Sequence, residues 1–130
     1  MGDQANGDCF VVAAEIVSCF DTAAIASSDK AKRAIAVLKE IGVTHHGVRL
    51  CHGTVTRDSD QREHAHAWVE LPEMNDLVVD FSNGHNVMMC KHTYYTAGRI
   101  KDRKDYDYYT ARQMLVRHAT YGPWEGEDDN

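Results

Sequence analysis

The sequence predicts an α+β fold in which an N-terminal helix packs on an antiparallel β-sheet. The run at 9–20 is almost entirely apolar, which is typical of a buried helix, and an amphipathic helix follows at 30–41. From 43 onward apolar and polar residues alternate with the period of strands. The 130 residues suit one domain with one core, which we expect over 1–124, followed by an acidic and disordered tail at 125–130.

Two helices are expected in the first third of the chain. The first begins at Cys9, after a loop rich in Gly, Asp and Asn, and Asp8 stands where it can cap this helix or lie in its first turn. The second carries an apolar stripe made of Ala34, Ile35, Val37, Leu38 and Ile41. Because Lys and Arg fill its opposite face and Gly42 follows as a C-terminal cap, the stripe is expected to face the core.

Strands are expected in the middle of the chain. Within 43–56, Val48 and Leu50 alternate with Arg49 and Cys51, which predicts a half-buried strand. Turn residues then separate the further expected elements, which are a strand through Trp68 to Leu71, a strand over 77–81, one or two strands within 87–100, a charged loop at 101–107 and a short helix at 109–118 with Met114 and Leu115 facing inward.

Three residues on these elements have the side chains that a thiol nucleophile needs. Cys9 lies at a helix start, where the positive end of the helix stabilises a thiolate. His66 and Asp80 lie on neighbouring strands, where an imidazole can take the thiol proton and a carboxylate can fix the imidazole tautomer. The pattern therefore predicts a Cys-His-Asp triad and an enzyme of acyl transfer.

The alternation along the two strands favours a His–Asp pair. A hairpin must keep the apolar faces of both strands together, because a slip of one residue would bury polar groups. With a three-residue loop at 72–74, His66 is expected directly opposite Asp80 on the less apolar face. Cross-strand Cβ atoms are about 5 Å apart, within reach of a hydrogen bond. Trp68 shares this face and is expected to shield the pair from water or to contact the substrate.

Two segments of the chain resemble those of a known superfamily. His66-Ala67-Trp68-Val69-Glu70 and Leu77-Val78-Val79-Asp80 resemble the His and Asp segments of transglutaminase-like cysteine enzymes, which belong to the papain-like superfamily. The resemblance covers about residues 4–82. It implies a papain-like or transglutaminase-like core with Cys9 as the nucleophile, His66 as general base and acid, and Asp80 as the orienting residue. Asn6-Gly7-Asp8-Cys9-Phe10 also resembles the Cys loop of ovarian-tumour-type deubiquitinases, in which the His normally lies near the C-terminus.

An oxyanion hole needs hydrogen-bond donors near the thiol. The backbone N–H of Cys9 is one candidate. Gln4 resembles the glutamine that papain-like enzymes place shortly before their Cys, and Asn6 is the competing candidate. The expected substrate is a protein or peptide, and the acyl acceptor is water in a peptidase or amidase and an amine in a transferase. This chemistry needs no metal and no cofactor.

Composition excludes several other classes. The net charge is −6 and no basic stripe is present, which argues against nucleic-acid binding. No apolar run approaches a membrane span, and no apolar segment follows a basic N-terminus as in a secretory signal, so neither a span nor a signal is expected. The cysteines are scattered without a CxxC pair, as in proteins with reduced thiols, so we expect a cytoplasmic protein. The three cysteines other than Cys9 are expected to be core residues, namely Cys19, Cys51 and Cys90.

Two alternatives remain open at this point. Imidazoles and thiolates suit zinc, and a zinc-binding module could be built on His64 and His66 with further ligands from His45, His46, His52 or Cys51. The spacings match no closed zinc signature. The other alternative is an inactive relative that keeps the fold as a binding surface. The reactivity of Cys9 compared with that of the other three thiols distinguishes these alternatives from an enzyme.

Overall fold

The computed structural model describes residues 8–56, 59–82 and 86–124. These residues form an α+β fold with four α-helices and a five-stranded sheet in the order β4-β3-β2-β1-β5. Every neighbouring pair of strands is antiparallel. The strands are β1 (Arg49–Thr56), β2 (Glu63–Leu71), β3 (Leu77–Asp80), β4 (Val87–Met89) and β5 (Lys101–Tyr106). The α+β class is therefore confirmed, whereas the predicted tail at 125–130 lies outside the described residues.

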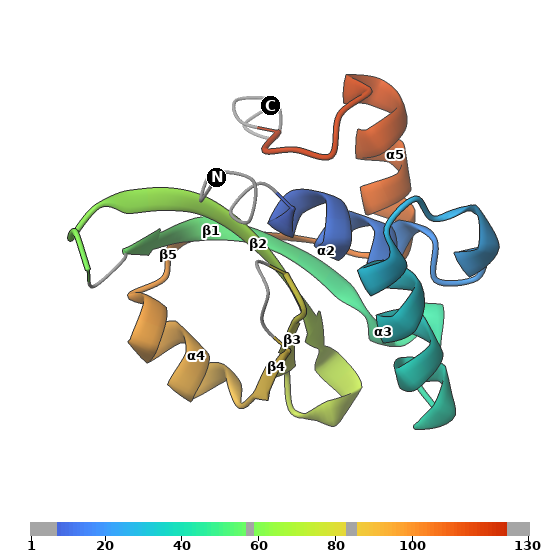
Figure 1. Cartoon of the computed structure of the whole chain (residues 1–130), viewed down its shortest axis with the longest axis horizontal. Helices are drawn as coiled ribbons and strands as arrows, with labels where there is room; N and C mark the ends of the chain where they lie inside the picture. The colour runs from blue at the N-terminus through green and yellow to red at the C-terminus, as the bar shows by residue number, and fades with distance from the viewer. Residues whose placement is uncertain (1–7, 57–58, 83–85, 125–130) are drawn as a thin grey trace.

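The helices cover both faces of the sheet. Three of them lie together on one side and the fourth, α4, lies on the other (Figure 1). The helices are α2 (Cys9–Ser18), α3 (Asp29–Glu40), α4 (Lys91–Gly98) and α5 (Tyr108–His118). Short 3₁₀ turns precede α3, β1 and β3, namely η1 (Ala23–Ile25), η2 (His45–Gly47) and η3 (Pro72–Met74). Among the described residues, no helix has the length and apolar character needed to cross a bilayer.

Helix α2 is the centre of the main core. Its apolar residues, among them Ile16 and Val17, are buried in one cluster with Ala67 and Val69 of β2. The helix is buried on almost all sides because α3 and α5 pack on it from beyond the sheet. This explains why its sequence is apolar all round instead of amphipathic. The predicted helix at Cys9 is confirmed, and the packing holds its first residue in a defined place.

Helix α3 begins and ends as predicted but buries a narrower face. The Ser28 hydroxyl accepts a hydrogen bond from the backbone N–H of Ala31 at 3.2 Å and caps the helix. Gly42 follows the helix with φ +92°, a conformation that favours glycine. The predicted stripe was too wide, because Val37 and Ile41 are 43% and 49% exposed. The buried residues of the helix are Ala31, Ala34, Ile35 and Leu38.

Three segments differ from the expectations. Residues 43–48 contain the turn η2, and the strand begins only at 49. Residues 91–98 form the helix α4 instead of a strand, and the expected charged loop contains the edge strand β5. Tyr106 of β5 is buried opposite Leu50 of β1, while much of the strand faces solvent. Charged side chains are common on an edge strand because they discourage pairing with another chain.

The second face of the sheet is also covered. Cys51, Trp68 and Val78 are fully buried there, and Tyr94 and Tyr95 of α4 pack against them. The sequence predicts that this face is the less apolar one, and the types of its side chains agree with that prediction. The face is nevertheless buried. Because α4 covers the polar residues of this face, they lie in a largely water-excluded layer, where ionic and hydrogen-bonded pairs are stronger.

Candidate active site

His66 and Asp80 form a close pair. Atom Nε2 of His66 lies 2.9 Å from Oδ2 of Asp80, and their side chains are only 14% and 12% exposed. Antiparallel alternation sends both side chains to the face covered by α4. The sequence pattern predicted this contact, but it predicted a different register.

The observed register is shifted by two residues. Val69 lies opposite Val79 and Leu71 opposite Leu77, so five residues, 72–76, connect the strands instead of three. Continuing this ladder places Asp80 across from Trp68, which makes His66 its diagonal neighbour. Diagonal neighbours on one face remain within reach of long side chains. The predicted direct opposition was therefore wrong, while the contact forms because a shift of two residues keeps both side chains on the same face.

The Asp80 carboxylate is held by further donors. It accepts hydrogen bonds from the backbone N–H and the hydroxyl of Ser82 at 3.2 and 2.5 Å, and from the Tyr94 hydroxyl at 2.6 Å. Burial alone would raise the pKa of Asp80, but the hydrogen bonds and charge of His66, with those from Ser82 and Tyr94, lower it. Asp80 is thus a fixed carboxylate, as the orienting member of a triad must be.

Tyr94 is a member of this site that the sequence reasoning did not identify. Its hydroxyl oxygen lies 3.1 Å from Nε2 of His66 in addition to its bond to Asp80. Burial and the charge of Asp80 raise its pKa, so the phenol stays protonated and donates. The sequence analysis predicts one or two strands within 87–100, whereas Tyr94 lies in the helix α4. Gly98 at the end of α4, followed by Arg99 in the left-handed conformation, was the available signal of a helix end.

Cys9 reaches the pair from the start of α2. Its residue is 2% exposed, and it lies close enough to His66 to raise the pKa of the imidazole. Because Nε2 of His66 is engaged by Asp80 and Tyr94, Nδ1 is the ring nitrogen left for the thiol. Strand β3 pairs with β2 only along Val69–Leu71, so His66 lies beyond the end of that ladder and α2 approaches it there.

The imidazole of His66 is electrostatically tuned. Burial lowers its pKa, but the hydrogen bonds and charges of Asp80 and Cys9 outweigh burial and raise the pKa of His66 to about 9. An imidazolium is therefore the favoured form at neutral pH. In this position it lies beside the Asp80 carboxylate and close to Cys9 at the start of α2.

The other residues predicted for this site have different outcomes. Trp68 is fully buried and stacks on His66, with ring centroids 6.0 Å apart, so it shields the pair as expected. Its indole N–H donates to Glu70 at 2.9 Å, so this donor is already engaged. Gln4 and Asn6 lie outside the described residues.

Asp8 precedes α2 but does not cap it. The residue has φ −98° and ψ −3°, which differs from the extended backbone of a typical N-cap, and its side chain makes no capping hydrogen bond. Its carboxylate instead lies 2.6 Å from Nζ of Lys30 in α3. This ion pair connects the start of α2 to α3 next to Cys9.

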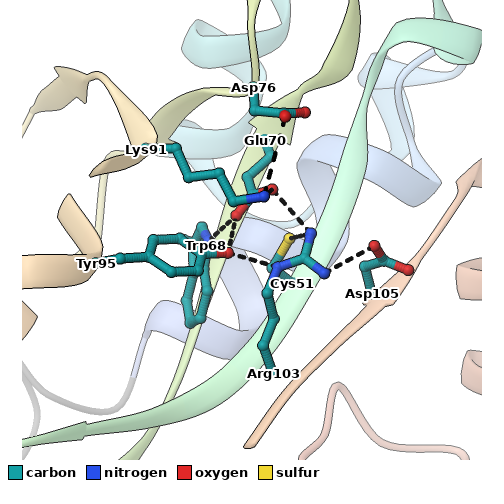
Figure 2. A network of polar contacts seen from close by, with 8 residues as sticks. All are labelled: Cys51, Trp68, Glu70, Asp76, Lys91, Tyr95, Arg103 and Asp105. Atoms are coloured by element: carbon teal, nitrogen blue, oxygen red, sulfur yellow. Dashed lines mark hydrogen bonds and ion pairs between the residues drawn. The ribbon is translucent and has the colours of Figure 1, made fainter. Parts of the chain in front are cut away.

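A network of polar contacts supports Trp68 from behind (Figure 2). Glu70 is 1% exposed and accepts hydrogen bonds from Trp68, from the Tyr95 hydroxyl and, at 2.8 Å, from Arg103. Burial raises the pKa of Glu70, but the hydrogen bonds from Arg103, Tyr95 and Trp68 lower it, so the carboxylate is charged. The network ties β2, β5 and α4 together, and it fixes the ring that lies against His66.

The three remaining cysteines occupy different environments. All four thiols are free. Cys51 is fully buried, and burial raises its pKa. Cys19 is half-buried. Cys90 was expected in the core, but it is exposed at the start of α4, where a hydrogen bond with Thr93 at 2.9 Å lowers its pKa. Cys90 is therefore a thiol that electrophiles can reach.

The histidines that the structure describes do not gather around a metal site. Within 8–56, 59–82 and 86–124, no group of three or more His, Cys, Asp or Glu side chains could hold a metal ion. His66 is engaged by Asp80, and His45 lies 2.7 Å from Asp21 on another part of the molecule. The described residues thus do not bring the predicted zinc ligands together.

Comparisons of this chain with protein families, with curated proteins and with solved structures find no match.

Proposed function

We propose that this protein is a cysteine-dependent acyl-transfer enzyme with Cys9, His66 and Asp80 as its triad and a transglutaminase-like or papain-like core. One observation supports this proposal above all others. His66 is hydrogen-bonded to the buried carboxylate of Asp80, and the Cys9 thiol at the start of a helix lies close enough to raise the pKa of the imidazole. A thiol, an imidazole and a carboxylate in this order are the groups that an activated thiol nucleophile needs.

In the proposed reaction, the Cys9 thiolate attacks the carbonyl carbon of an acyl donor. The carbonyl π electrons move to the oxygen, and the backbone N–H groups at the start of α2 stabilise the oxyanion. When the intermediate collapses, the bond to the leaving nitrogen breaks and His66 gives its proton to that nitrogen. Water or an amine then attacks the thioester carbon, His66 takes the proton of the attacking group, and the Cys9 thiolate leaves.

The raised pKa of His66 supports its role as general acid. At neutral pH the imidazole already holds the proton that the leaving group needs. Asp80 and Tyr94 hold Nε2, which keeps the ring oriented while Nδ1 exchanges a proton with the thiol and the reacting groups. We place a protein or peptide substrate in this site, and the free thiols are consistent with a reducing compartment such as the cytoplasm.

The test is selective alkylation with a limiting amount of iodoacetamide, mapped by mass spectrometry at a pH of about 6, where ordinary thiols are almost fully protonated. The protein carries Cys90→Ser, because Cys90 is exposed and hydrogen-bonded to Thr93. We expect Cys9 to be labelled faster than Cys19 and Cys51. In His66→Gln the rate at Cys9 should fall by about tenfold or more, since the imidazolium no longer stabilises the thiolate.

His64→Gln is the matched control, because His64 lies two residues away on the same face of β2. It should leave the labelling of Cys9 unchanged. Labelling of Cys9 that is no faster than that of Cys51, or that His66→Gln leaves unchanged, would contradict the triad. The chain would then be better explained as a binding protein.

A further inference from the structure

An aromatic pocket opens beside the start of α2. It has a volume of about 240 Å³ and lies among α2, β1, β2, β5 and the C-terminal part of the described chain. We define it by the residues that form its walls, which are Phe10, His52, Ala65, Tyr106, Pro123 and Trp124. An engineered apolar cavity of about 150 Å³ holds benzene, so the pocket is large enough for one aromatic side chain.

The walls of the aromatic pocket are rings held in place by one another. The centroid of His52 lies 5.0 Å from that of Phe10, 5.2 Å from that of Tyr106 and 4.9 Å from that of Trp124. Trp124 is almost fully buried, and its indole N–H donates to the backbone carbonyl of Thr120 at 2.9 Å. Such a wall favours a further ring, which can add edge-to-face contacts to apolar burial.

The aromatic pocket borders the proposed reaction centre. Phe10 directly follows Cys9 in α2, and Ala65 directly precedes His66 in β2. Gly53, which also lines the pocket, lies opposite His66 in the β1–β2 ladder. A group in the pocket therefore lies beside the start of α2, next to the residue that carries the thiol, whereas the side chains of Ala65 and His66 point to opposite faces of β2.

We propose that the aromatic pocket binds an aromatic side chain on the acyl side of a peptide substrate. This inference rests on the proposed function, because the carbonyl of that peptide is the one that Cys9 attacks. Asp102 and Lys104 both lie at the pocket and carry opposite charges. Their charges balance, so the ring walls set the preference and select an apolar aromatic group over a charged one.

Binding is tested apart from reactivity in the Cys9→Ser protein. N-acetyl-phenylalaninamide and N-acetyl-alaninamide are titrated while amide chemical shifts are followed by NMR. We expect saturable shifts at Gly53, Ala65 and Tyr106 with the phenylalanine probe, and binding of the alanine probe that is weaker by about tenfold or more. Equal binding of the two probes, or shifts that map elsewhere, would overturn the inference.

A filling variant makes the test specific for the pocket. Ala65→Leu extends a side chain into the aromatic pocket and should abolish binding of the phenylalanine probe. Glu63→Leu is the matched control, because Glu63 points from the same face of β2 but does not line the pocket. Binding that survives Ala65→Leu would overturn the inference even if both proteins fold.

The two proposals fail in different ways. Specific binding of the phenylalanine probe to a protein whose Cys9 is unreactive would support the pocket and contradict the proposed enzyme. A reactive Cys9 that depends on His66, combined with no preference for the phenylalanine probe, would support the enzyme and contradict the pocket.

Discussion

Replacing Asp80 by Asn removes the charge that faces His66 and leaves the imidazole buried. In the wild-type chain burial lowers the pKa of His66, and Asp80 and Cys9 together raise it to about 9. Without the carboxylate charge, burial should prevail, and we expect the pKa to fall to about 6.5 or below. One pH unit corresponds to about 1.4 kcal/mol, so a fall from about 9 to about 6.5 would mean that the imidazolium loses about 3 kcal/mol of stabilisation.

The assay is a pH titration of the imidazole Cε1–H signals by NMR, with His66 assigned by comparison with His66→Gln. Asp76→Asn is the matched control, since Asp76 is a half-exposed carboxylate beside the same strand and its described ion-pair partner is Lys91 at 3.9 Å. In this control the pKa of His66 should stay near 9. A wild-type His66 that titrates near 6.5, or a His66 that still titrates near 9 in Asp80→Asn, would refute the electrostatic account.

The same pKa makes a prediction about stability. His66 has a higher pKa in the folded chain than the value of about 6.5 expected when the chain is unfolded. The contribution of His66 to the free energy of unfolding is therefore fully present below pH 6.5 and is lost as the pH rises through 9. The free energy of unfolding, measured with urea, should decrease by up to about 3 kcal/mol more in wild type than in Asp80→Asn over this range.

Two further substitutions test the supporting structure. Glu70→Ala leaves the Arg103 guanidinium and the Trp68 indole N–H without their partner, and it should lower the free energy of unfolding by about 3 kcal/mol or more in chemical denaturation; a loss below about 1 kcal/mol would contradict the role of the network. Because the pKa of Glu70 is lowered in the folded chain, its contribution is present above its ordinary value of 4.5 and is lost as the pH falls below that value. Gly53→Ala would place a Cβ atom 2.8 Å from the buried Trp68 ring, and it should cost about 1–3 kcal/mol in the same assay. The matched control is Thr54→Ala, because Thr54 follows Gly53 in β1 and the substitution adds no atom. It should leave the Trp68 ring undisturbed, as tryptophan fluorescence would show. Gly42→Ala is unsuitable as a steric control because Gly42 has a positive φ.

The sequence-based predictions of secondary structure were wrong for two segments. The structure of each depends on another element against which it pairs or packs, and the local sequence carries no signal of that element. Residues 101–106 are mostly charged and lack the apolar alternation of a half-buried strand. They become β5 because the edge of β1 offers unpaired backbone groups, which depends on the sheet and on no local pattern. Residues 91–98 have aromatic residues and threonines that are common in strands, yet they form α4 because Trp68 and Val78 require an apolar cover on that face.

By itself, the sequence determined which residues could form the candidate site and on which sides of their elements they lie. The apolar run after Asp8 places Cys9 at a helix start, and the period of two along the strands puts His66 and Asp80 on one face in any register that keeps the apolar faces together. The tertiary structure decided the register itself, the contribution of Tyr94 and the burial that tunes His66. These depend on loop geometry and on contacts between residues far apart in the chain, which local periodicity does not encode.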